Sequence, residues 1–209
     1  MMINDLVNRY PVLAEVRDAI EMVYKLLVEC YENGGKVLIV GNGGSAADSE
    51  HIVGELMKGF LKNRPVSTEM YEALVAVDPV RGEALARNLQ GGLPAIALTT
   101  HTSLNTAFAN DRDPVMIYAQ QVNGYGKPGD VFLGISTSGN AENVMYAAVT
   151  AKAKGMKVLA LTGKDGGKLA KVADVSIIVP EKETYKIQEL HLPIYHVLCL
   201  MLEDHFYEL

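Results

Sequence analysis

The sequence predicts an α/β fold, a three-layer sandwich in which a doubly wound, five-stranded parallel sheet carries helices on both faces. Short apolar runs rich in Val, Ile and Leu recur along the chain, and most are followed by a polar or glycine-rich loop and then a helical pattern. Strands that alternate with helices form parallel sheets covered on both sides. The expected strands are residues 36–40, 95–98, 131–135, 158–161 and 175–179.

Helical patterns open and close the chain. Apolar side chains recur at spacings of three and four between residues 10 and 32, which predicts one long helix with a single apolar face. Pro11 fits the first turn of this helix, and residues 33–35, Asn-Gly-Gly, fit its end. Further helices are expected after residue 46, near Leu104, up to Val149, and from about residue 184 to near the end.

Residues 62–94 fit this plan poorly. Prolines, glycines and charges interrupt the stretch, and only residues 68–75 and 80–88 have the pattern of short helices. Long excursions between core elements often serve as lids or partner surfaces. With no linker or repeat elsewhere, the sequence predicts a single domain over residues 1–209 with one excursion.

Composition excludes several classes of protein. The net charge of −6 argues against a general nucleic-acid binder, which needs clustered Lys and Arg. Cys30 and Cys199 lie in apolar helical patterns without CxxC spacing, so we expect core residues rather than a disulfide or a cysteine zinc site. The first residues lack a signal-peptide pattern, and no apolar stretch approaches the ~18 residues of a membrane span. We therefore expect a cytoplasmic protein with no membrane partner.

Two loops that follow expected strands have the composition of anion-binding loops. Residues 41–45 read GNGGS, and glycines let backbone N–H groups approach an anion at a helix N-terminus. Residues 136–140 read STSGN, and three hydroxyls at a strand–helix junction can cradle a phosphate. The simpler alternatives are a tight strand–helix connection for residues 41–45 and ordinary helix caps for residues 136–140. Because two loops offer the same chemistry, we interpret them as a phosphate site.

Two helical patterns carry candidate acid, base or metal ligands. His51 and Glu55 are four residues apart, so they share one helix face and can bind a divalent metal or act as an acid–base pair. A surface pair is the alternative. On the last helix Gln188 shares a face with both His191 and His196, and spacing alone does not choose between the two histidines.

Several motifs together resemble phosphoheptose isomerases, which carry the sugar isomerase (SIS) domain. The resemblance covers nearly the whole chain, in order and in spacing. Its motifs are residues 41–48, 51–55, 109–111, 133–140, 161–167 and 187–196.

The resemblance implies an isomerase that interconverts sedoheptulose 7-phosphate and D-glycero-D-manno-heptose 7-phosphate. It also implies zinc, and a homotetramer with sites at subunit interfaces. By position, the implied zinc ligands are His51, Glu55, Gln188 and His196, which selects His196 over His191. The implied substrate contacts are Asn42, Gly43, Gly44, Glu55, Asn110, Asp111, Ser136, Thr137, Ser138 and Gln188.

Three features depart from the family pattern. Ala141 stands where the family usually has Ser, which puts one phosphate contact in doubt. Tyr185-Lys186 replaces a common Asp-Arg pair, and the 62–94 excursion is longer than expected. These departures leave open an isomerase for another sugar phosphate, such as a pentose or hexosamine phosphate.

The expected chemistry passes a proton between adjacent carbons through an enediol. We expect Glu55 to remove and return the carbon-bound proton, and His196 to act as a second acid or base. Zinc ligation competes for the same Glu55 carboxylate, and the sequence leaves both roles open. The rival from another class is a non-catalytic phosphosugar-binding protein that binds the replication initiator. That group tends to lose the acidic residue at position 55, which this chain keeps.

Overall fold

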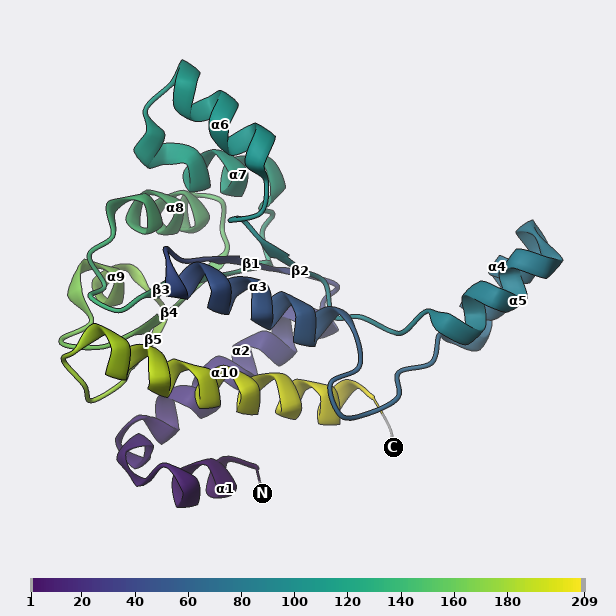
Figure 1. The fold of residues 1–209 in the computed structure, drawn as a ribbon, viewed down its shortest axis with the longest axis horizontal. Coiled ribbons are helices and arrows are strands. Elements are labelled where there is room, and N and C mark those ends of the chain that lie inside the picture. Colours follow the sequence, from purple (N-terminus) through teal and green to yellow (C-terminus); the bar gives the residue numbers. More distant parts are fainter. Residues whose placement is uncertain (1, 208–209) are drawn as a thin grey trace.

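A computed structural model describes residues 2–207, and in it the chain forms a five-stranded, all-parallel sheet with the order β2-β1-β3-β4-β5 (Figure 1). Val37 pairs with Ala95 on one side and with Val131 on the other, so β1 lies between β2 and β3. The predicted α/β sandwich is confirmed. The strands are β1 Val37–Val40, β2 Ala95–Ala97, β3 Val131–Ser136, β4 Lys157–Thr162 and β5 Val175–Ile178.

One face of the sheet packs against α2 (Arg17–Glu32), α3 (Gly44–Met57) and α10 (Thr184–Phe206). The short helix α1 (Met2–Arg9) lies outside this layer and contacts α10. The other face packs against α7 (Ile117–Tyr125), α8 (Glu142–Ala153) and α9 (Gly167–Val172). On that side α6 (Thr102–Asp111) and the 3₁₀ turn η2 (Pro114–Met116) cover α7 (Figure 1).

The helix expected over residues 10–32 begins differently. Residues Pro11–Val16 form a 3₁₀ helix, η1, and α2 starts only at Arg17. Tyr10 has an extended φ of −132°, as expected before proline, whose ring disfavours the helical conformation of the preceding residue. The single-domain prediction also includes residues 1, 208 and 209, which lie outside the described residues.

Three short helices, α1, α7 and α9, were not expected from the sequence. Helix α7 shows why, since its sequence IYAQQVNGY mixes polar residues and a glycine with few apolar ones. Its place is fixed by tertiary packing, because Tyr118 and Val122 are buried in the second core. Among residues 2–207 no helix is both long and apolar enough to cross a bilayer.

The excursion folds into a helical hairpin that projects away from the sheet (Figure 1). Its helices are α4 (Thr68–Val77) and α5 (Pro79–Asn88), close to the two short helices expected from the sequence. Asp78 separates them and caps α5 by accepting from the amides of Val80 and Arg81. The two helices pack on each other, and their large apolar side chains remain exposed, namely Met70, Tyr71, Val77, Val80 and Leu85.

The strand order places a topological switch between β1 and β3. After β1 the chain crosses to β2 on one side, whereas β3 leads on to β4 and β5 on the other. In doubly wound sheets ligands bind in the crevice outside the carboxyl ends of strands at such a switch. The loops at residues 41–45 and 136–140 follow these two strands. The fold therefore brings both predicted anion loops to the position where ligands collect.

Candidate active site

The loop after β1 makes a tight turn into α3. Gly43 has a φ of 57°, which favours glycine, and a Cβ on Gly41 would lie 2.3 Å from the Ser45 carbonyl oxygen. The Asn42 and Asn143 side-chain amides exchange two hydrogen bonds of 2.9 Å, which join this loop to the start of α8. Asn42 is thus held at the border between the two loops.

The loop after β3 is held by its neighbours. Ser136 is buried at the end of the strand, and its carbonyl accepts from the amide of Gly139 at 3.0 Å. Gly139 has a φ of 64° and lies so close to the Gly166 carbonyl that a Cβ would clash with it. The Ser138 hydroxyl accepts from the amide of Asn140 at 3.2 Å. Ala141 provides no side-chain cap for α8, which agrees with the missing hydroxyl noted in the sequence.

His51 and Glu55 meet on one face of α3. Nε2 of His51 lies 3.2 Å from Oε1 of Glu55, and the other carboxylate oxygen lies 3.5 Å from Nζ of Lys58. The Glu55 side chain is only 14% exposed, so its carboxylate is largely shielded from water. The imidazole of His51, the carboxylate of Glu55 and the ammonium group of Lys58 therefore follow one another within two helical turns.

His196 from α10 packs directly on this pair. Its ring lies 5.0 Å from the His51 ring, centroid to centroid, and 5.5 Å from the ring of Phe60. Its Nε2 is buried and has no hydrogen-bond partner among residues 2–207. Burial lowers the pKa of His196 below its ordinary value, and the neighbouring His51 lowers it further. The neutral ring is therefore favoured, and in the tautomer with its proton on Nδ1 the partnerless Nε2 can bind a proton or a ligand.

Tyr195 and Asp48 orient His51 from behind. The Tyr195 hydroxyl lies 3.0 Å from Nδ1 of His51 and donates to Oδ1 of Asp48 at 3.3 Å. Burial raises the pKa of Tyr195, and the charge of Asp48 raises it further, so the phenol stays protonated. If the phenol donates to Asp48, Nδ1 of His51 carries a proton. The lone pair on Nε2 then faces Glu55, and a proton or cation between them is favourable.

Gln188, on α10, contacts the start of α3 rather than the turn that carries His51 and Glu55. Its side chain crosses Gly44, where an added Cβ would be 2.6 Å from Nε2 of Gln188. Gly44 precedes His51 by seven residues, or about 10 Å along the helix axis. In this conformation Gln188 borders the anion loop of residues 41–45 rather than the cluster of His51, Glu55 and His196.

Asn110 and Asp111 are not brought to the cluster within one chain. They form the exposed end of α6, where the amide of Asn110 donates to Asp111 at 2.9 Å. This helix covers α7 on the opposite face of the sheet from α3 and α10 (Figure 1). His191 also lies apart, since it is fully buried and its Nε2 is 3.2 Å from the Thr162 carbonyl.

The donor set between α3 and α10 has the chemistry of a zinc site. Imidazole nitrogens and carboxylate oxygens are common zinc ligands, and the orphaned Nε2 of His196 lacks any other partner among the described residues. Side chains as they stand in residues 2–207 include no group of three or more His, Cys, Asp or Glu arranged to hold a metal. The residues fit the metal by type, and His51, Glu55 and His196 are adjacent.

Sequence reasoning missed the residues that support the cluster. Tyr195 and Asp48 orient His51, Phe60 packs on His196, and Lys58 pairs with Glu55. Asp48 lies one helical turn before His51, and this spacing was a usable signal. Tyr195 contacts a residue 144 positions away, and no local pattern announces such a contact.

Comparison with known proteins decides the family. Residues 4–88 and 80–163 match the model of the SIS domain. Phosphoheptose isomerases of Aneurinibacillus thermoaerophilus and Helicobacter pylori are each 40% identical to the chain, over 91% and 93% of its length and 83% and 88% of theirs. The chain belongs to the phosphoheptose isomerase family.

Solved structures of this family share the fold. A phosphoheptose isomerase from Neisseria gonorrhoeae has a TM-score of 0.73 and 34% identity, and the match covers 95% of this chain and 94% of that one. One from Francisella tularensis has the same TM-score at 32% identity, with 96% and 97% covered. The resemblance read from the motifs is therefore confirmed, for both the phosphoheptose isomerase family and its SIS domain.

Proposed function

We propose that the protein is an aldose–ketose isomerase that interconverts sedoheptulose 7-phosphate and D-glycero-D-manno-heptose 7-phosphate through an enediol. The observation that carries the proposal is the convergence of His51, Glu55 and His196. The rings of His51 and His196 are 5.0 Å apart, centroid to centroid, and Nε2 of His51 lies 3.2 Å from Oε1 of Glu55. The curated phosphoheptose isomerases at 40% identity support this substrate. Retention of Glu55 argues against the non-catalytic rival that binds the replication initiator.

The sugar phosphate would be anchored at the switch point of the sheet. Its phosphate would bind at the Ser136, Thr137 and Ser138 turn, where backbone N–H groups and hydroxyls can donate without a cation. The sugar chain would then run past Asn42, Gly43, Gly44 and Gln188 toward the middle of α3. His51 lies about 10 Å beyond Gly44 along the helix axis and Glu55 one further turn, so the reacting end of the sugar would have to reach the second half of α3.

Proton transfer would be performed by Glu55 and His196. Glu55 would take the proton from one carbon and return it to its neighbour, and Nζ of Lys58 lies 3.5 Å from its second oxygen. The pKa of His196 lies below its ordinary value, so its neutral ring can accept a proton from a sugar hydroxyl and return it to the other oxygen. Tyr195 would hold His51 in one orientation throughout.

We propose zinc as the metal, with His51, Glu55, Gln188 and His196 as ligands. The Gln188 side chain borders Gly44 in this conformation, so it would have to leave that position to join the other three. A bound zinc ion would supply positive charge that polarises the carbonyl oxygen of the sugar. The partnerless Nε2 of His196 and the Nε2 of His51 facing Glu55 support the ligand set. Glu55 and His196 belong to both the ligand set and the acid–base pair, so metal content and proton transfer need separate measurements.

We propose further that the active form is a homotetramer with sites at subunit interfaces, located in the cytoplasm. Asn110 and Asp111 lie across the sheet from the cluster in their own chain, so a second copy would have to supply them to the sugar (Figure 1). The two cysteines, Cys30 and Cys199, are free and buried, as is usual in a reducing compartment.

The decisive experiment assays purified protein with sedoheptulose 7-phosphate and identifies the product, with pentose, hexose and hexosamine phosphates as competing substrates. We expect turnover of the heptulose phosphate to exceed the others by at least about 10-fold in kcat/KM. Glu55→Gln should lose at least about 100-fold in kcat. Wild-type protein without turnover on any sugar phosphate would refute the proposal, and preference for a shorter sugar would replace the substrate.

The metal and the assembly have their own measurements. Metal analysis of purified protein should give zinc, and His196→Ala should lower the zinc content even where no substrate is added. Full activity in chelator with no bound zinc would contradict the metal proposal. Light scattering gives the mass of the assembly, and a monomer with full activity would contradict the shared site.

A further inference from the structure

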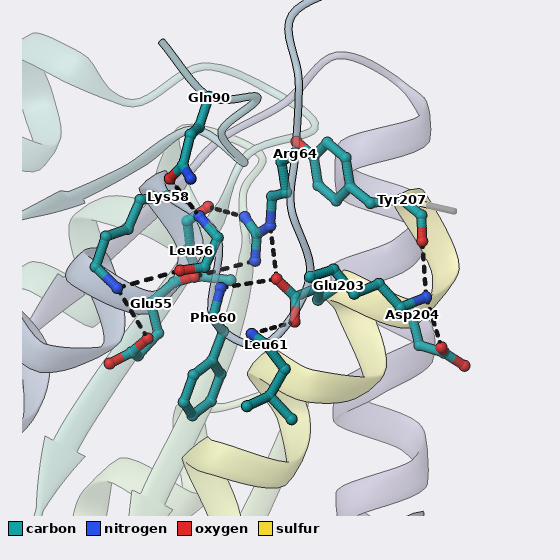
Figure 2. Close-up of polar contacts among 12 residues, drawn as sticks. Glu55, Leu56, Lys58, Phe60, Leu61, Arg64, Gln90, Glu203, Asp204 and Tyr207 are labelled. Carbon is teal, nitrogen blue, oxygen red and sulfur yellow. Dashed lines mark hydrogen bonds and ion pairs between the residues drawn. The ribbon is translucent and has the colours of Figure 1, made fainter. Parts of the chain in front are cut away.

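Arg64 is a fully buried cation just beyond the end of α3. Its side chain is 0% exposed, and three of its nitrogens donate hydrogen bonds (Figure 2). Nε donates to Oε1 of Glu203 at 2.9 Å, Nη1 to the Leu56 carbonyl at 2.8 Å, and Nη2 to the Glu55 carbonyl at 3.2 Å. The Tyr207 ring covers the guanidinium at 4.7 Å.

The two carbonyls that Arg64 binds belong to the last turn of α3. Carbonyls in the last turn of a helix lack intrahelical partners, and a cation there also complements the helix dipole. One of them is the carbonyl of Glu55 itself. Arg64 therefore fixes the backbone of the proposed base, on the side of the helix away from its carboxylate (Figure 2).

Glu203 fixes a second segment. Its Oε1 accepts from the amide of Phe60 at 2.7 Å, and its Oε2 accepts from the amide of Leu61 at 2.8 Å. Burial raises the pKa of Glu203, but the hydrogen bonds from Leu61, Phe60 and Arg64 outweigh it and hold the pKa below its usual value. The ring of Phe60 packs on His196. By binding the Phe60 amide, Glu203 therefore fixes the position of the ring that contacts His196.

A purely stabilising role explains this pair poorly. Well-packed apolar residues often stabilise a protein as much as a buried ion pair does, because desolvation offsets the attraction. Here the hydrogen bonds of the pair go to backbone atoms on the two sides of the catalytic cluster, at Glu55 and Leu56 on one side and at Phe60 and Leu61 on the other. The pair therefore restrains the two backbone segments that carry Glu55 and the ring of Phe60.

We propose that Arg64 and Glu203 are positioning residues for catalysis, whose buried ion pair sets Glu55 and His196 at their working separation. The inference rests on the proposed isomerase function. Misplacement of a catalytic group by a fraction of an ångström reduces kcat far more than it reduces substrate binding. Loss of the pair should therefore appear in kcat while KM changes little.

The test compares two carboxylate-to-amide variants of similar chemistry. Glu203→Gln keeps the shape and removes the charge that binds Arg64. Asp130→Asn does the same to a second ion pair, Lys36–Asp130, whose carboxylate side chain is 5% exposed. Its hydrogen bonds go to Lys36 and Lys127 rather than to the segments around Glu55 and Phe60. Arg64→Lys keeps the charge but has a single nitrogen, which cannot take the place of the three separate nitrogens of the guanidinium. Each variant is assayed for kcat and KM, and the ring protons of His196 are followed by NMR.

We expect Glu203→Gln and Arg64→Lys to lose at least about 10-fold in kcat, with KM within about threefold. Asp130→Asn should stay within about twofold in both. The His196 ring protons should shift in the first two variants, because the Phe60 ring moves, and stay in place in the third. Where one of the two positioning variants does not fold, the other is measured.

Wild-type kcat in Glu203→Gln, or equal losses in Glu203→Gln and Asp130→Asn, would overturn the inference. An inactive wild type would instead refute the proposed function. In that case the NMR comparison still decides the positioning role, and unmoved His196 protons in Glu203→Gln and Arg64→Lys would reject it.

Discussion

The hydroxyl of Tyr195 lies 3.0 Å from Nδ1 of His51, so α10 orients a histidine of α3 through a single hydrogen bond. The same hydroxyl donates to Asp48 at 3.3 Å. A half-buried carboxylate, a phenol and an imidazole thus form one hydrogen-bonded chain that ends at Nε2 of His51, where Glu55 lies 3.2 Å away. Partners of this kind fix the tautomer and the ring orientation of a ligating histidine.

Tyr195→Phe removes this orientation and leaves the packing intact. We expect about a 10-fold loss of zinc affinity or of kcat, as is typical when an outer partner of a ligating histidine is removed. Unfolding should become easier by about 1–3 kcal/mol, because Asp48 and His51 lose a buried partner. Tyr185→Phe is the matched control, since Tyr185 is on the same helix and 55% exposed. Wild-type zinc affinity and kcat in Tyr195→Phe would contradict the orienting role.

Gly44→Ala tests the contact between the anion loop and Gln188. The new Cβ would lie 2.6 Å from Nε2 of Gln188, so that side chain must move. We expect KM for the sugar phosphate to rise about 10-fold, because an amide of the proposed substrate site is displaced. Gly54→Ala is the control, since nothing lies within 4 Å of its Cβ position on the same helix. That control should gain up to about 1 kcal/mol of stability, and an unchanged KM in Gly44→Ala would refute the contact's role.

Local features of the site could be predicted from the sequence. The GNGGS and STSGN loops each follow a strand directly, and the four-residue spacing of His51 and Glu55 fixes a shared helix face. His196 was selected by resemblance alone, because spacing on α10 favoured His191 equally. The structure separates the two histidines, with His191 bonded to Thr162 and His196 packed on His51.

The supporting residues could not be predicted, for a physical reason. Arg64 and Glu203 are 139 positions apart and meet only when α10 packs beside α3. Charged residues are usually exposed, so sequence pattern assigns both to the surface. The same limit applies to α7, whose few apolar residues are buried by tertiary packing rather than by a helical stripe.

His191 predicts a pH dependence of stability. Burial lowers its pKa from 6.5 to about 4, although the hydrogen bond with the Thr162 carbonyl acts in the opposite direction. Between pH 6.5 and about pH 4, His191 is therefore protonated in the unfolded chain and neutral in the folded chain. The free energy of unfolding falls as the pH drops through this range. Between pH 7 and pH 5 this contribution amounts to about 2 kcal/mol.

His191→Gln tests this dependence, because the amide is neutral throughout and can still donate to Thr162. Denaturant unfolding at pH 7 and pH 5, at one protein concentration, should show the variant losing about 2 kcal/mol less than wild type. Other acidic and basic groups contribute equally to both proteins and cancel in the difference. Equal losses in the two proteins would mean that His191 is protonated in the folded state.

Excision of the α4–α5 hairpin tests how much the projecting segment contributes to the stability of the chain. The two helices pack on each other and expose Val77 and Val80 to 89% and 80%, so the chain's own core gains little from them. Their base is closed by a bridge between Pro65 and Gln90 and by a hydrogen bond of 2.6 Å from the Gly91 amide to the Arg64 carbonyl. A Gly/Ser loop of about four residues can therefore replace residues 67–88 without moving the base.

We expect this excised protein to fold, with a thermal midpoint within about 4 °C of wild type, because that shift corresponds to roughly 1 kcal/mol for a chain of this size. Gln90→Ala in the intact chain is the comparison. It removes the acceptor of the Gly59 amide, bonded at 2.9 Å, and should destabilise more than the excision does. A large loss of stability or of assembly mass on excision would show that the exposed apolar face of the hairpin is covered by another copy of the chain. In that case the excursion would belong to the quaternary structure.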